Sequence, residues 1–212
     1  MNPTQIIADI LAKKPRLRDV FFAACGGSLV DFYPAQYLIN NEGQRLHAGI
    51  YPSAEFINTP PRRLSADSLT VVCSHNGSTA ESLGAASLAK ERRSTLVTLT
   101  FKPGSPIEEQ SDYRLSYPWG PGSPVRQQPM ALGLSLASAL LASVDGYAHH
   151  KQVLAGNEGK TYYSTRRSSR SLTRPVNSVV CSTTRNFVWG IPTVHLFLKE
   201  SVHLWIRRNS VK

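Results

Sequence analysis

Two short loops of the sequence consist almost entirely of small residues, and each follows an apolar run. The first loop, "CGGS", contains Gly26, Gly27 and Ser28. The second loop, "SHNGST", spans residues 74–79 and follows "LTVVC". Glycine lets backbone N–H groups approach a ligand closely, and hydroxyl and amide side chains add further hydrogen-bond donors, so such a loop can bind an anion at the start of a helix. The pattern predicts a phosphate site that needs no lysine.

The candidate phosphate ligands are the polar residues of both loops: Ser28, Ser74, His75, Asn76, Ser78 and Thr79. Three glycines, Gly26, Gly27 and Gly77, would bring the backbone close to the substrate. Neither loop has the GxxxxGK[ST] or the GxGxxG pattern, which excludes the common nucleotide-binding loops. A plainer alternative stays open, because a turn rich in serine and threonine is often only a helix cap, here with Ser78 or Thr79 as the cap.

The elements around these loops are predicted from apolar patterning. Apolar runs predict strands over residues 19–25, 45–51, 69–74, 94–101 and 113–117. Composition and spacing predict helices over residues 2–14, 28–42, 53–58, 78–93, 105–111 and 130–150. Most of the strands are continuously apolar, as is typical of parallel strands covered on both faces. We therefore predict an α/β fold, a three-layer sandwich with a mainly parallel five-stranded sheet, in which ligands bind beyond the carboxyl ends of the strands.

The net charge of +10 is concentrated near one end of the chain. Residues 1–150 carry 13 Lys+Arg and 12 Asp+Glu, whereas residues 151–212 carry 11 Lys+Arg and only 2 Asp+Glu. After about residue 160, arginine alternates irregularly with serine and threonine, without a helical or strand period. We predict a domain over residues 1–150 and a basic, Ser/Arg-rich tail over 151–212 that is poorly ordered. Nucleic-acid binding by this tail is the weakest alternative, because no aromatic residues interleave with the arginines of 165–170.

Cysteine usage and hydropathy indicate the compartment. Cys25, Cys73 and Cys181 form no CxxC pair, so reduced thiols are expected rather than a disulfide or a zinc site. His149 and His150 lack further ligands for a metal. The sequence shows no signal peptide and no apolar run long enough to span a bilayer, so we expect a cytoplasmic protein that is not bound to a membrane.

The order of several motifs resembles the sugar isomerase (SIS) domain family. They are "FFAACGGS", "FYPAQYL", "IYPSAEFINTPP", "VVCSHNGSTAES", "LVTLTFKPGSPIEEQSDY" and "DGYAH". Within that family the sequence is most similar to the deglycases that split 6-phosphorylated fructosyl or glucosyl amino acids. The resemblance covers residues 5–150. It implies a flavodoxin-like sheet, a sugar phosphate as ligand, and chemistry without a metal or an organic cofactor.

The resemblance also implies roles for individual residues. In SIS proteins the positions matching Ser74, Asn76 and Thr79 hold the sugar phosphate most directly, and the position matching Ser28 joins them. His75 replaces a residue that is often glutamine or lysine in relatives, so its ring is expected either at the ligand or at the rim of the site.

Catalytic residues are less clear from the resemblance. Glu55 is the one acidic residue that the family pattern places near the sugar, and it could bind hydroxyls or assist ring opening. A surface carboxylate that caps a short helix is an equally good interpretation.

A second SIS lobe supplies the catalytic acid and base of the deglycases, in an "HSGEFxHGP"-like segment that this sequence lacks. A basic tail without a core pattern is what translation in another reading frame would produce. We therefore hypothesise that the nucleotides encoding residues 160–212 specify SIS sequence in another frame.

Sequence alone thus predicts a protein of carbohydrate-derivative metabolism that binds phosphorylated sugars. The family activity would be deglycation of 6-phosphosugar–amino acid adducts or aldose/ketose isomerisation, which makes the chain a shortened member of an enzyme family. The alternative is a non-catalytic, regulatory sugar-phosphate-binding module. Because SIS relatives commonly pair, we expect a homo-oligomer or a partner lobe.

Overall fold

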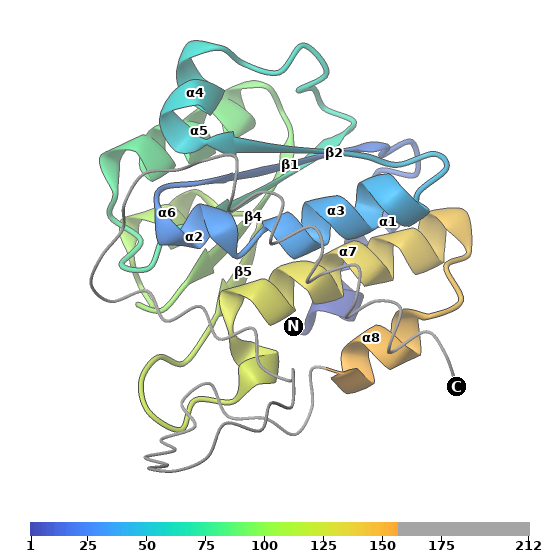
Figure 1. The fold of residues 1–212 in the computed structure, drawn as a ribbon. Coiled ribbons are helices and arrows are strands. Elements are labelled where there is room, and N and C mark those ends of the chain that lie inside the picture. Colours follow the sequence, from blue (N-terminus) through green and yellow to red (C-terminus); the bar gives the residue numbers. More distant parts are fainter. Residues whose placement is uncertain (157–212) are drawn as a thin grey trace, which may run out of the picture.

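The computed structural model describes residues 1–156, in which one sheet lies between two layers of helices (Figure 1). The five strands are β1 (Asp19–Ala24), β2 (His47–Pro52), β3 (Ser68–Cys73), β4 (Thr95–Thr100) and β5 (Tyr113–Ser116). They follow the order β2-β1-β3-β4-β5, and every neighbouring pair is parallel. The predicted α/β sandwich with a parallel five-stranded sheet is therefore confirmed.

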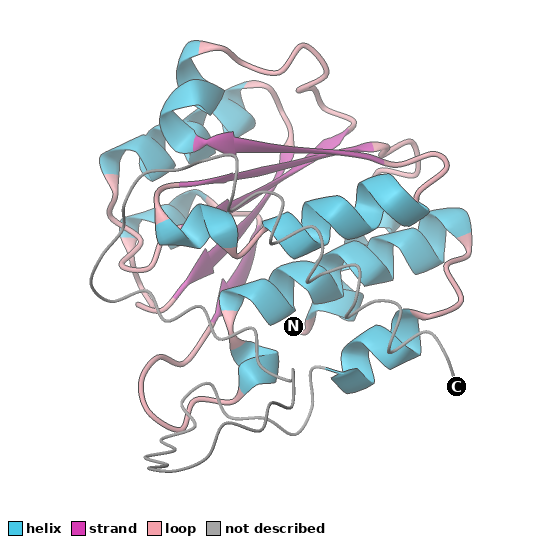
Figure 2. Cartoon of the chain, in the orientation of Figure 1, coloured by secondary structure: helices cyan, strands magenta, loops and turns pink. Residues whose placement is uncertain are grey.

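Each face of the sheet is covered by its own set of helices (Figure 2). The helices α1 (Pro3–Lys13), α3 (Tyr33–Glu42) and α7 (Pro129–Asp145) bury apolar side chains on one face. The other face is covered by α4 (Ser53–Asn58), α5 (Ala80–Glu91) and α6 (Pro106–Gln110). Two short helices complete the described chain: α2 (Gly27–Val30) follows β1, and α8 (His150–Gly156) packs against α7.

The central strands consist of apolar residues with a few serines and threonines, because both of their faces are buried. All six residues of β3 and all six of β4 are buried. In β3, Val71 points into the core beneath α1, α3 and α7, whereas Val72 points into the core beneath α4, α5 and α6. This is the arrangement expected of parallel strands in an α/β protein, and it explains why the apolar runs predicted the strands well.

The predicted helix over residues 28–42 is wrong in one respect, because the structure divides it into α2 and α3. Pro34 lies in the first turn of α3. Proline has no N–H group to bond to the carbonyl one turn earlier, so it is tolerated at the start of a helix but not in its interior. The chain therefore ends α2 at Val30 and begins a new helix at Tyr33.

The predicted helix over residues 130–150 ends earlier than expected, because α7 stops at Asp145. Gly146 adopts a left-handed conformation with φ of +71°, and it ends α7 in the way that glycine commonly ends helices. A second helix, α8, starts at His150. The connection between β5 and α7 contains one turn of 3₁₀ helix over Val125–Gln127.

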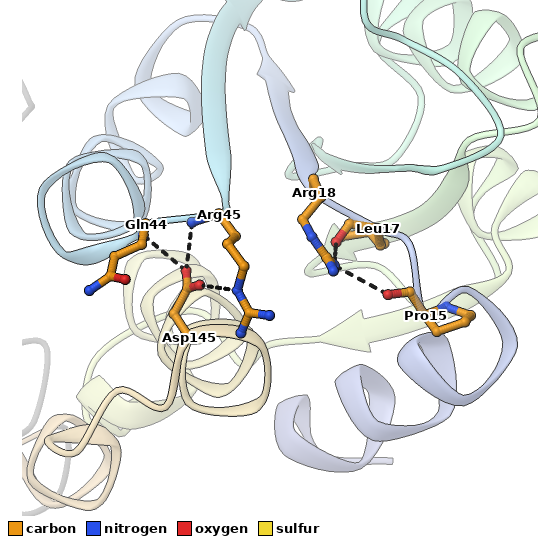
Figure 3. A network of polar contacts seen from close by, with 6 residues as sticks. All are labelled: Pro15, Leu17, Arg18, Gln44, Arg45 and Asp145. Atoms are coloured by element: carbon orange, nitrogen blue, oxygen red, sulfur yellow. Dashed lines mark hydrogen bonds and ion pairs between the residues drawn. The ribbon is translucent and has the colours of Figure 1, made fainter.

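A buried carboxylate fastens the end of α7 to the loop between α3 and β2 (Figure 3). The Asp145 side chain is 3% exposed and accepts hydrogen bonds from the backbone N–H groups of Gln44 and Arg45, at 3.1 and 3.4 Å, and from Arg45 Nε at 3.0 Å. Burial alone would raise the pKa of Asp145, but these hydrogen bonds outweigh burial and hold the pKa below its ordinary value. In the same view, Arg18 donates to the carbonyl groups of Pro15 and Leu17.

Several predictions concern residues outside the described part of the chain. The reading-frame hypothesis falls on residues after 156, as does most of the predicted tail, whereas residues 151–156 belong to α8. The domain boundary at residue 150 stays a prediction. Within residues 1–156, no helix combines the length and the apolar character needed to cross a membrane.

Candidate phosphate-binding site

The two small-residue loops leave the sheet at adjacent points of one edge. Ala24 and Cys73, the last residues of β1 and β3, pair directly in the sheet. From β1 the chain continues through α2 and α3 to β2, whereas from β3 it continues through α5 to β4 on the opposite side. The strand order therefore reverses between β1 and β3, and in open α/β sheets the crevice at such a reversal is the usual ligand site.

Two hydroxyl groups of the second loop face each other at the start of α5. Ser74 is 3% exposed, and its Oγ lies 3.1 Å from Oγ1 of Thr79. Thr79 occupies the N-cap position of α5, yet its side chain makes no capping hydrogen bond. The structure thus differs from the plain helix-cap alternative, because the threonine hydroxyl pairs with Ser74. The N–H groups of the first turn of this helix point toward the same region, where an anion is favoured.

Gly77 fixes the shape of the second loop. Its φ is +66°, its N–H donates to the carbonyl of Ser74 at 3.1 Å, and its carbonyl accepts from the N–H of Ile107 at 3.0 Å. A Cβ at this position would overlap the side chain of Ser105. Only glycine fits here, and the exposed residues Asn76 and Ser78 flank it on either side.

The first loop contacts the second through its flanking residues. Gly26 and Gly27 are exposed, and Ser28 is half-buried. The hydroxyl of Ser28 hydrogen-bonds to the thiol of Cys73, the residue just before Ser74. The first loop therefore lies against the strand that carries the second loop.

A second contact joins the first loop to α5. Cys25 Sγ lies 3.7 Å from Ser82 Oγ, and Ser82 belongs to the first turn of α5. Ser82 Oγ lies in turn 3.5 Å from Oγ of Ser53, the first residue of α4. Small polar side chains from three successive connections thus meet at one edge of the sheet.

His75 lies among aromatic rings from the loops that follow β4 and β5. Its Nδ1 is 3.1 Å from the hydroxyl of Tyr117. The ring of Phe101 is stacked on the imidazole at 5.1 Å with an interplanar angle of 9°, and Trp119 approaches edge-on at 4.8 Å and 71°. Burial lowers the pKa of His75, so the ring is neutral at neutral pH and can offer one donor and one acceptor.

Sequence reasoning missed Asp31, which follows α2 and is half-buried. Burial raises the pKa of its carboxyl group to about 7. The thiol of Cys73 has a pKa of about 12, because it is completely buried and because Asp31 lies near it. Cys73 therefore stays protonated and does not act as a nucleophile. The signal for Asp31 was a lone acidic residue between apolar residues in "SLVDFY".

In the described part of the chain, no hydrogen bond or ion pair connects the side chain of Glu55 to either small-residue loop. Glu55 is exposed on α4, and its backbone carbonyl accepts from the N–H of Thr59 at 2.8 Å. Of the two histidines that follow α7, His150 directs Nδ1 to Oγ of Ser138 at 3.0 Å. The described residues contain no cluster of three or more side chains that could hold a metal ion.

Comparison with known proteins supports the resemblance. The sequence model of the SIS domain matches residues 18–144, more than half of the chain. The chain belongs to the SIS domain family. The match covers both loops and all five strands, so the candidate site lies within the SIS domain.

Among individual relatives, the fructosamine deglycase FrlB of Bacillus subtilis is 39% identical over 101 residues, which are 48% of this chain and 31% of the deglycase. A candidate phosphosugar isomerase of Salmonella typhimurium LT2 superposes with a TM-score of 0.71 at 34% identity, over 74% of this chain and 47% of that one. A second candidate phosphosugar isomerase, from Bacillus subtilis, superposes with a TM-score of 0.68 at 29% identity. This superposition covers 73% of this chain and 47% of that one. The chain thus spans about half the length of these solved structures and a smaller part of the deglycase.

Proposed function

We propose that this SIS domain binds a phosphorylated sugar and that the two loops hold its phosphate. The Ser74–Thr79 hydroxyl pair carries the proposal, because it lies where the strand order reverses and in front of a helix start that Thr79 leaves uncapped. Hydroxyl groups, backbone N–H groups and a helix N-terminus together suit a phosphate better than a neutral sugar hydroxyl. Ser28, His75, Asn76 and Ser78 would complete the set, with Gly26, Gly27 and Gly77 shaping the backbone.

We propose further that the reaction served by this site is deglycation or aldose/ketose isomerisation, in the cytoplasm. Hydrolysis of a 6-phosphosugar–amino acid adduct breaks the bond between sugar carbon and amine nitrogen and gives a hexose 6-phosphate and a free amino acid. Proton transfer between C1 and C2 through an enol-type intermediate requires an acid and a base. In this chain Glu55 is the candidate, and a partner lobe or a second copy would supply the rest.

A non-catalytic binding module is the second candidate. The groups gathered at the two loops are hydroxyls, an amide, a neutral imidazole and backbone N–H groups, and no carboxylate among residues 1–156 is hydrogen-bonded to them. Such a set binds a phosphate but does not by itself move a proton between sugar carbons. Incubation with 6-phosphofructosyl-lysine distinguishes the two candidates, because release of glucose 6-phosphate requires catalysis, whereas binding without release favours the module.

Isothermal titration calorimetry tests phosphate binding. Glucose 6-phosphate should bind the wild-type chain, and glucose should bind far more weakly. Replacing both hydroxyls, by Ser74→Ala with Thr79→Ala, removes hydrogen bonds to a charged group and should weaken binding by roughly tenfold or more for each. Ser87→Ala, an exposed position of the same helix, is the matched control and should bind as the wild type does. Equal affinity for glucose and glucose 6-phosphate would rule out this site.

A further inference from the structure

Two exposed aromatic rings lie beside the candidate phosphate site. Phe101 is 39% exposed and Trp119 is 44% exposed, and the remaining large apolar side chain exposed in the described part is Met1 at the N-terminus. Large aromatic residues are normally buried, so two exposed rings at one place indicate a binding surface. Both rings belong to loops at the same sheet edge as the phosphate site, because they follow β4 and β5.

His75 connects these rings to the phosphate loop. The imidazole stacks on Phe101 and meets the edge of Trp119, while its own backbone belongs to the 74–79 loop. The carbonyl of His75 accepts a hydrogen bond from the N–H of Phe101 at 3.0 Å and another from Oγ1 of Thr100 at 3.2 Å. The loops after β3 and β4 are therefore held together, and the rings keep a fixed place relative to Ser74.

We propose that Phe101 and Trp119 form a subsite for the amino acid part of a 6-phosphosugar–amino acid adduct. In such an adduct the amino acid is attached at the end of the sugar that is remote from the phosphate. This inference rests on the proposed function, since the phosphate anchors the ligand at Ser74 and Thr79. The rings then contact a large apolar or aromatic side chain of the amino acid part. The chain thus prefers 6-phosphosugar adducts of bulky amino acids over adducts of glycine and over the free sugar phosphate.

The chemistry of the rings determines this choice of ligand. Aromatic faces and edges attract other aromatic rings, and a ring pair contributes beyond simple burial of area. The expected preference for a phenylalanine adduct over a glycine adduct is roughly three- to tenfold in Kd. Lys102 is exposed in the same loop, and it would act on the charge of the ligand rather than on its side chain.

Calorimetry with three probes tests the inference: fructose 6-phosphate and the 6-phosphofructosyl adducts of glycine and of phenylalanine. In the wild type the phenylalanine adduct should bind more tightly than the glycine adduct. In Phe101→Ala with Trp119→Ala the two adducts should bind with equal affinity, while fructose 6-phosphate should still bind. Trp119→Phe keeps a ring and should retain the preference, and Lys102→Ala should retain it as well.

Tryptophan fluorescence gives a second readout. Trp119 is the one tryptophan of residues 1–156, so a chain with Trp189→Phe and Trp205→Phe reports from the proposed subsite alone. The phenylalanine adduct should change this emission more than fructose 6-phosphate does.

Two outcomes separate the failure of this inference from the failure of the proposed function. Equal binding of both adducts to the wild type, with fructose 6-phosphate still bound, overturns the subsite and leaves the phosphate site intact. No binding of any probe overturns both. If the double alanine variant instead converts a dimer into a monomer in sedimentation and leaves adduct preference unchanged, the rings are a self-association surface and the ligand subsite is refuted.

Discussion

Replacing Gly77 by alanine tests how tightly the phosphate loop is built. The residue has φ of +66°, where an ordinary side chain costs roughly 1–2 kcal/mol. The added methyl group would also lie closer than 3.0 Å to the side chain of Ser105, and overpacking of this kind costs roughly 1–3 kcal/mol. Alanine also restricts the unfolded chain more than glycine does, which offsets roughly 0.4–1 kcal/mol of this destabilisation. We therefore expect Gly77→Ala to lower the free energy of unfolding by about 2–4 kcal/mol.

Two other glycines separate these contributions. Gly104 has nearly the same φ, +69°, but a Cβ there meets no atom within 4 Å, so Gly104→Ala should cost only the backbone strain, about 1 kcal/mol. Gly27 lies in the first phosphate loop, has no positive φ, and also has open space around it. Gly27→Ala should therefore be neutral or slightly stabilising.

Urea denaturation followed by circular dichroism gives the three free energies of unfolding. The difference between Gly77→Ala and Gly104→Ala isolates the contact with Ser105. If the free energies of unfolding of these two variants agree within about 0.5 kcal/mol, a Cβ at position 77 meets no costly overlap with Ser105. The interpretation that the second loop is tightly packed would then be refuted. Gly77→Ala should also weaken binding of glucose 6-phosphate, whereas Gly104→Ala should not.

Three further predictions concern ionisable groups that are wholly or partly buried. Asp145→Asn should lower the free energy of unfolding by about 1–3 kcal/mol, because Arg45 loses a charged acceptor. In urea titrations at decreasing pH, this difference from the wild type should shrink as pH falls through the depressed pKa of the wild-type carboxyl group. For Asp31 the dependence of stability on pH has the opposite sign, because the pKa of its carboxyl group is raised to about 7 in the folded chain. The wild type should therefore lose up to about 4 kcal/mol of unfolding free energy as pH rises from about 4 to about 7. Asp31→Asn should flatten this decline, as thermal melts at several pH values would show. A pH-independent difference between Asp31→Asn and the wild type would contradict the assignment. Iodoacetamide should alkylate Cys25 well before Cys73 in the native chain, as peptide mass spectrometry would show, because Cys73 is buried with a pKa of about 12; equal labelling would contradict that burial.

The sheet could be predicted from the sequence because its central strands are buried on both faces. The runs ending at Cys73 and Thr100 are apolar or β-branched throughout, which is typical of strands that are covered on both faces. The helix boundaries at Val30 and Gly146 were harder. There helical composition continues across the break, and a single proline or glycine decides where the helix ends.

The polar part of the candidate site was also visible in the sequence, since Ser74 and Thr79 belong to one short loop. Its surroundings were not. Phe101, Tyr117 and Trp119 reach His75 only because β4 lies next to β3 and β5 lies next to β4 in the sheet, and local sequence patterns do not reveal strand order. The same holds for Cys73, whose burial beside the carboxyl group of Asp31 depends on the pairing of β1 with β3.

Phosphate binding by the two loops is tested most directly by an amide NMR titration of the labelled chain with glucose 6-phosphate. We predict saturable shifts at the amides of residues 26–28 and 74–82, and glucose at the same concentration should leave these amides unshifted. Shifts that appear only at the arginine-rich residues 165–170, or that glucose reproduces fully, would contradict a sugar-phosphate site at the carboxyl ends of β1 and β3.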